Sequence, residues 1–146
     1  MKKILLLLIL VLISLTSFAQ TLRCTAGYVY EKAQALDARG NVIETFNNIR
    51  GTVLFYEKGS QTAIASTIGD QNMYVLEVIS KKTYPDSNVY LGHMSYEGRM
   101  VMIEVFEVFD LDKGKVDPDY FLFFVRDNVT GERINGQAYL NISRKI

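Results

Sequence analysis

The single histidine, His93, restricts the enzymatic chemistry that this chain can perform. A hydrolase with a Ser-His-Asp or Cys-His arrangement would have to use it as the general base. Its neighbours Leu91-Gly92 and Met94-Ser95 are typical of a strand, and the chain has no Gly-x-Ser-x-Gly turn. With Cys24 it also falls short of the three protein ligands that a catalytic zinc site usually needs. We therefore predict no catalytic residue, and a hydrolase centred on His93 is the weakest hypothesis.

Carboxylates are the second group of residues with chemical potential. Glu104 and Glu107 are three positions apart, so on one strand they would lie on opposite faces and could not act as an acid–base pair. Calcium prefers oxygen clusters such as the four aspartates of one ten-residue loop: Asp110, Asp112, Asp117 and Asp119. The spacing departs from an EF-hand, because Gly114 comes one position early and Phe121 occupies the twelfth position. The sequence favours a solvated acidic turn, with a calcium site as the alternative.

The first nineteen residues predict a signal peptide. Lysines at positions 2 and 3 precede ten apolar residues, 4–13, and Ser17 and Ala19 supply the small residues of a cleavage site. The apolar run is shorter than the roughly 20 residues that span a bilayer, so we expect no membrane span after cleavage. An anchor on Cys24 is disfavoured by the preceding Arg23. The sequence thus predicts an exported protein, periplasmic or extracellular.

The remaining chain, residues 20–146, has the length of a single domain. Its charge is nearly balanced, because removing Lys2 and Lys3 from sixteen basic residues leaves fourteen against sixteen acidic ones. The basic residues are scattered, which argues against a nucleic-acid partner. No glycine-rich phosphate loop is present, and we predict no cofactor and no metal site. The lone Cys24 excludes an internal disulfide, so the hydrophobic core must hold the fold.

The elements that would carry these residues are mostly strands, because apolar residues recur with period two in short runs separated by Gly, Asn and Asp. We expect strands at 22–30, 42–46, 52–57, 62–68, 73–80, 89–95, 100–109, 120–126 and 137–143. Residues 31–38 are rich in helix formers and predict at most one short helix. The fold class is therefore mainly β, an antiparallel β-sandwich of roughly eight strands. A small lipocalin-like β-barrel is the alternative, less favoured because the strands are short and irregularly spaced.

The chain resembles no known family closely enough for functional residues to be transferred. Lipocalin-like barrels share its size and β pattern, but their usual early Gly-x-Trp signature is absent, since the chain has no tryptophan. The likeness is one of fold alone.

Two predicted strands are apolar on both faces, which is more than a sheet with one wet side requires. One explanation is a central strand covered on its outer side, and another is an exposed patch for a protein partner or self-association. A third is an internal pocket for a small apolar ligand. The residues that would form such an interface or pocket are Met100, Met102, Phe106, Phe121 and Phe123.

Nine tyrosines raise the question of glycan binding, because aromatic rings stack on the apolar faces of sugars. Candidates for exposed contacts near predicted strand ends or turns are Tyr28, Tyr30, Tyr84, Tyr90 and Tyr96. The leading functional prediction is a non-enzymatic module that binds a protein or a glycan, and the alternative is a carrier of a small apolar ligand. The carrier predicts an enclosed cavity, whereas the module predicts a filled core with an exposed patch.

Overall fold

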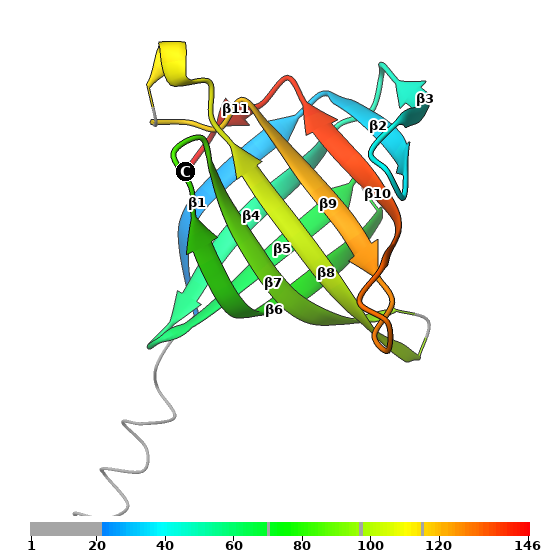
Figure 1. The fold of residues 1–146 in the computed structure, drawn as a ribbon. Coiled ribbons are helices and arrows are strands. Elements are labelled where there is room, and N and C mark those ends of the chain that lie inside the picture. The colour runs from blue at the N-terminus through cyan, green and yellow to red at the C-terminus, as the bar shows by residue number, and fades with distance from the viewer. Residues whose placement is uncertain (1–21, 70, 97, 115) are drawn as a thin grey trace, which may run out of the picture.

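Eleven strands and one short 3-10 turn make up the part of the chain that the computed structural model describes (Figure 1). The described residues are 22–69, 71–96, 98–114 and 116–146, without the side chains of 71–73 and 96. The predicted signal peptide, 1–19, therefore lies outside them. The elements are β1 (Arg23–Tyr30), β2 (Lys32–Asp37), β3 (Val42–Phe46), β4 (Gly51–Lys58), β5 (Gln61–Ile68), β6 (Gln71–Thr83), β7 (Ser87–Tyr96), β8 (Arg99–Val108), η1 (Leu111–Lys113), β9 (Tyr120–Arg126), β10 (Arg133–Leu140) and β11 (Ser143–Arg144).

All eleven strands belong to one antiparallel sheet in the order β11-β1-β4-β5-β6-β7-β8-β9-β10-β2-β3. Only Glu31 separates β1 from β2, yet β1 pairs with β4 and β2 pairs with β10 near the other end of this order. The sheet must therefore curl until its two ends approach each other, as Figure 1 shows. At the bend, the Glu31 backbone N–H donates to the Leu140 carbonyl oxygen at 3.3 Å. The sheet nevertheless remains open, since no ladder joins its edge strands β11 and β3 in the described residues.

The mainly β class and the antiparallel pairing are confirmed, but the eight-stranded sandwich is not. The ladders connect every described strand into one sheet, so no second layer exists to form a sandwich. The alternative of a closed barrel is not confirmed either, because the sheet is open. The curl was not predictable from the sequence because hydrophobic alternation defines the two faces of each strand but says nothing of which strands are neighbours. Among the described residues no helix has the length and apolarity to cross a membrane.

The predicted short helix at 31–38 is wrong. Lys32–Asp37 form β2, which pairs with β10 on one side and with β3 on the other. Ala33 and Leu36 are both buried in the strand conformation. Backbone pairing on two sides and this burial outweigh a helix propensity worth only tenths of a kcal/mol per residue.

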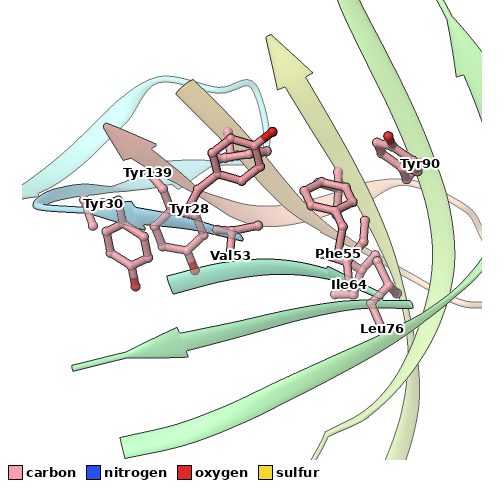
Figure 2. Packing of buried hydrophobic residues seen from close by; sticks show 12 residues of the cluster. Tyr28, Tyr30, Val53, Phe55, Ile64, Leu76, Tyr90 and Tyr139 are labelled. Atoms are coloured by element: carbon pink, nitrogen blue, oxygen red, sulfur yellow. The ribbon is translucent and has the colours of Figure 1, made fainter. Parts of the chain in front are cut away.

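The inner face of the curled sheet carries the main core, to which nine of the described strands contribute (Figure 2). Four aromatic side chains from different strands, which we call the aromatic floor, pack together at one end: Tyr28, Phe55, Tyr90 and Phe121. The Tyr28 and Phe121 ring centroids are 5.3 Å apart, and those of Phe55 and Tyr90 are 5.5 Å apart. All four side chains are buried, so the floor fills this end of the interior.

Tyr30 joins segments that are distant in the sheet order. It is fully buried, and its hydroxyl donates to the Thr67 carbonyl oxygen of β5 at 2.7 Å. Its ring stacks on Tyr139 of β10 with centroids 4.3 Å apart. Gly51 lies beneath the phenol, where a Cβ atom would collide with both the Tyr30 hydroxyl and the Thr67 carbonyl. A glycine is therefore required at this crossing.

We expect Tyr30→Phe to lower the free energy of unfolding by about 1 kcal/mol, because it removes the hydrogen bond to Thr67 and keeps the ring stacking. Urea unfolding followed by circular dichroism measures this change. Tyr56→Phe is the matched control, because Tyr56 lies on the outer face of β4 and is not buried. Equal stability of the two variants would contradict the role given to the Tyr30 hydroxyl.

Candidate functional site

A pocket of about 290 Å³ lies inside the curled sheet. Its wall is mostly aliphatic and aromatic, and six strands contribute to it, from β5 to β10. The lining residues are Ile64, Ser66, Ile68, Tyr74, Leu76, Met94, Val101, Ile103, Phe123, Val125, Asn135, Gly136, Gln137 and Tyr139. None of them carries a charge at neutral pH.

The pocket opens at the end opposite the aromatic floor. Ile68 and Val125 lie at or near the ends of β5 and β9, whereas Val101 and Asn135 lie near the beginnings of β8 and β10. These strand ends meet at one rim of the antiparallel sheet, where the β9–β10 turn lies at the lower right of Figure 1. Asn135 and Gln137 are exposed, while residues further along the strands are buried. The pocket is thus a cup with a polar rim and an apolar interior.

Three polar side chains meet in the pocket wall. The Tyr139 hydroxyl donates to Oε1 of Gln137. Burial raises the pKa of Tyr139 to about 12, with the neighbouring Ser66 offsetting part of the rise, so its phenol remains protonated at neutral pH. Ser66 is 4% exposed, and its Oγ forms no hydrogen bond of ordinary geometry with any described residue. A buried hydroxyl without a partner is rare in folded proteins and needs an explanation.

A second hollow of about 160 Å³ adjoins the first. The two share Ile68, Gln137 and Tyr139 as a common wall. Beyond this wall, Phe46 and Ile49 lie on the far side of the smaller hollow. The pair Gln137–Tyr139 therefore separates two spaces within the sheet.

The five residues predicted to form an interface or a pocket are divided between the two faces of the sheet. Phe123 lines the pocket and Phe121 belongs to the aromatic floor. The other three, Met100, Met102 and Phe106, alternate with the inward residues of β8 and lie on the outer face. They do not line the pocket, and only Met100 is largely exposed, at 58%. A pocket is present inside the sheet, but it is open at one end and its β8 wall is Val101 and Ile103.

The outer side of the apolar strands is covered by an ion-pair cluster. Glu104 accepts from Nη2 of Arg126 at 2.6 Å and from Nε of Arg133 at 3.0 Å. The Arg133 guanidinium lies over the ring of Phe124, 4.2 Å from its centroid. Leu36 of β2 packs with Phe124 on the same face. Because these side chains cover it, much of the apolar outer face of these strands is shielded without a partner protein.

Most of the five predicted tyrosines are not exposed. Tyr28, Tyr30 and Tyr90 are buried because they occupy inward positions of β1 and β7, so the expectation of surface contacts is corrected for them. Tyr84 is 47% exposed, next to the β6–β7 turn. The side chain of Tyr96 lies outside the described residues.

The two glutamates of β8 lie on opposite faces, as the odd spacing predicts. Glu107 is buried next to the aromatic floor, where Asn88 Nδ2 donates to its Oε1 at 2.8 Å. Burial raises the pKa of Glu107, while hydrogen bonds from Asn88 and Tyr90 and the charge of Lys81 oppose the rise. Burial next to this carboxylate also raises the pKa of Tyr90. No lining residue of the pocket belongs to this group.

The other chemically competent residues form no assembled site. His93 lies on the outer face of β7 opposite Met102, and within the described chain it forms no hydrogen bond or ion pair with a serine or carboxylate. In the acidic loop, Asp110 accepts from the Asp112 backbone, and Lys113 lies 3.8 Å from Asp110 and 3.5 Å from Asp119. No group of three or more potential metal ligands is found among the described residues.

Comparison with known proteins adds no family: neither the protein-family models, nor the curated proteins, nor the solved structures give a match.

Sequence reasoning missed the polar part of the pocket. Ser66 lies in the run Ala63-Ile64-Ala65-Ser66, where a small polar residue at an inward position gives no signal of its own. Tyr139 and Gln137 alternate correctly for one face of β10, but only the sheet order brings them beside β5 and β6 in the curled interior. The alternation that places Val101 and Ile103 inside was visible in the sequence.

We expect Glu107→Gln to stabilise the fold at pH 7 and to have little effect below pH about 4. The folded state holds the Glu107 proton to a higher pH than the unfolded chain, because burial raises the pKa above its ordinary value of 4.5. Wild-type stability is therefore lost as the pH rises from this value through the folded-state pKa, and the glutamine variant avoids that loss. Urea unfolding at several pH values measures the difference.

Glu104→Gln provides the control for the opposite face. It should lower the free energy of unfolding at pH 7 by about 1–3 kcal/mol, because two arginines lose a charged acceptor. A glutamine at position 107 that destabilises the protein equally at every pH would contradict a raised Glu107 pKa.

Proposed function

We propose that the protein is an exported carrier that binds a small, largely apolar molecule inside its curled sheet. The observation that supports this most is the 290 Å³ pocket with an uncharged wall. Protein interiors are close-packed and rarely leave voids much larger than a water molecule. A space near the lower limit of ligand pockets, roughly 300 Å³, therefore suits a small organic molecule.

The shape of the interior supports binding more than catalysis. The rim is polar, at Asn135 and Gln137, and the depth is apolar, at Ile64 and Leu76. A ligand would bury its apolar surface against these residues, which is the main source of affinity for such pockets. The buried carboxylate of Glu107 lies by the aromatic floor, away from the pocket lining. Export to the periplasm or the extracellular space, as the first nineteen residues predict, would place the carrier where it meets the ligand outside the cytoplasm.

A matched pair of variants on β8 tests the pocket. Val101→Phe is expected to lower affinity for the neutral fluorophore N-phenyl-1-naphthylamine by about tenfold or more, because it fills space that the probe needs. Met100→Phe places the same ring one residue away on the exposed outer face and should leave affinity within about twofold. The measurement is the rise in probe fluorescence on titration with the mature protein. If both variants bind as the wild type does, or if the wild type itself does not bind the probe, the carrier function is contradicted.

A second candidate, the interaction module, is favoured by β3. Within the described part of the chain this edge strand pairs with β2 alone, and all five of its residues are exposed, including Val42, Ile43 and Phe46. An exposed apolar edge is a template for pairing with another strand. The proposed partner is a second copy of the chain, whose β3 would extend the sheet.

Light scattering of the mature chain from Gln20 tests this self-association. We expect a dimer that Ile43→Lys converts to a monomer, because a lysine at an edge opposes strand pairing. Val129→Lys is the control, since Val129 is 94% exposed in the β9–β10 turn, away from β3. A monomer at every concentration would exclude the β3 dimer, and a dimer lost only on reduction would instead assign the contact to Cys24.

A further inference from the structure

We propose that the pocket selects a neutral amphiphile: an apolar chain or ring that carries one uncharged hydrogen-bonding group, which binds beside Ser66 and Tyr139. This inference rests on the proposed carrier function and adds the chemical class and the orientation of the ligand. The class is that of alcohols and ketones, and it excludes carboxylates and ammonium ions.

The orientation follows from the order of residues along the strands. On β5, Ile64 lies two residues further from the rim than Ser66, and on β6 Leu76 lies two residues further than Tyr74. Ile64 and Leu76 are 1% and 3% exposed. The apolar part of a ligand would therefore lie deepest. Its polar group would then reach the level of Ser66, on the side toward the rim.

Ser66 can provide a hydrogen-bond partner for the polar group of the ligand. Its Oγ is buried and unpaired in the described structure, although the residue lines the pocket. The Tyr139 hydroxyl donates to Gln137 and so gives no proton to Ser66, and Ser66, although close enough to lower the Tyr139 pKa, forms no hydrogen bond of ordinary geometry with it. A serine hydroxyl can turn about one torsion and can both donate and accept. A ligand hydroxyl or carbonyl beside it would remove the cost of this unpaired group.

The uncharged wall determines the preference for a neutral group. All fourteen residues that line the pocket are uncharged, and the Tyr139 phenol keeps its proton at neutral pH because burial raises its pKa to about 12. A carboxylate or ammonium group drawn beside Ser66 would lose much of its hydration without gaining an opposite charge. A neutral hydroxyl or carbonyl loses far less, and a single hydrogen bond compensates it.

The test compares eight-carbon ligands that differ only in the polar group. 1-Octanol, 2-octanone, octanoate and octylammonium compete with N-phenyl-1-naphthylamine for the mature wild-type protein and for Ser66→Ala. Ser95→Ala is the control, because Ser95 is an exposed residue of β7. We expect the alcohol and the ketone to bind wild type at least tenfold more tightly than either ion. Ser66→Ala should weaken the alcohol and the ketone by about threefold to tenfold, which corresponds to one hydrogen bond.

The fluorophore separates failure of this inference from failure of the carrier function. Ser66→Ala should still bind it, because burial of its two aromatic groups does not depend on the serine hydroxyl, and the variant should unfold in urea at the same or a higher concentration, since it loses an unpaired buried hydroxyl. If the fluorophore binds but octanoate or octylammonium equals the alcohol, or if Ser66→Ala leaves alcohol affinity unchanged, the neutral-amphiphile inference is overturned and the carrier survives. If wild type does not bind the fluorophore at all, both are overturned.

Discussion

The contact of Tyr30 with Thr67 and Tyr139 holds the curl on which the rest of the structure depends. β1 and β2 are one nearly continuous segment whose two parts pair at distant places in the sheet. Tyr30 is the last residue before the bend, and it contacts β5 through its hydroxyl and β10 through its ring. One buried side chain therefore links β1 to both β5 and β10. Tyr139 also lines the pocket, so the same contact shapes the cavity.

The interior divides into two ends with different chemistry. The aromatic floor and Glu107 fill one end, where Asn88 provides the hydrogen bond that a buried carboxylate needs. The other end contains the pocket, whose wall is mostly apolar and whose polar groups are all uncharged. On the outside, Arg133 covers Phe124 and pairs with Glu104, which lets β8 and β9 be apolar on both faces without leaving a large exposed patch. The apolar residues of these two strands thus lie in three places: the aromatic floor, the wall of the pocket, and the outer face that the arginines cover.

The sequence predicted the features that depend on local alternation and missed those that depend on strand order. Most strands are found near their expected ranges, although β10 begins at Arg133, four residues before the predicted 137. The opposite faces of Glu104 and Glu107 are also correct. The helix at 31–38 failed because pairing of β2 with two strands is a long-range effect. Tyr30 was expected at the surface for the same reason, because its partners Thr67 and Tyr139 are distant in the sequence and no local pattern predicts these contacts.

The hydrogen-bond partners of the interior polar groups distinguish the pocket from the aromatic floor. Tyr30, Tyr139 and Glu107 each have a hydrogen-bond partner within the chain. Among the described residues the Ser66 Oγ has no partner of ordinary geometry, although the backbone of Ser66 lies in a regular ladder. An alanine would fit the same position on β5 without an unpaired hydroxyl, so the serine costs stability in the empty protein. In the proposed carrier, the ligand would offset this cost by pairing with the hydroxyl that the fold leaves unpaired.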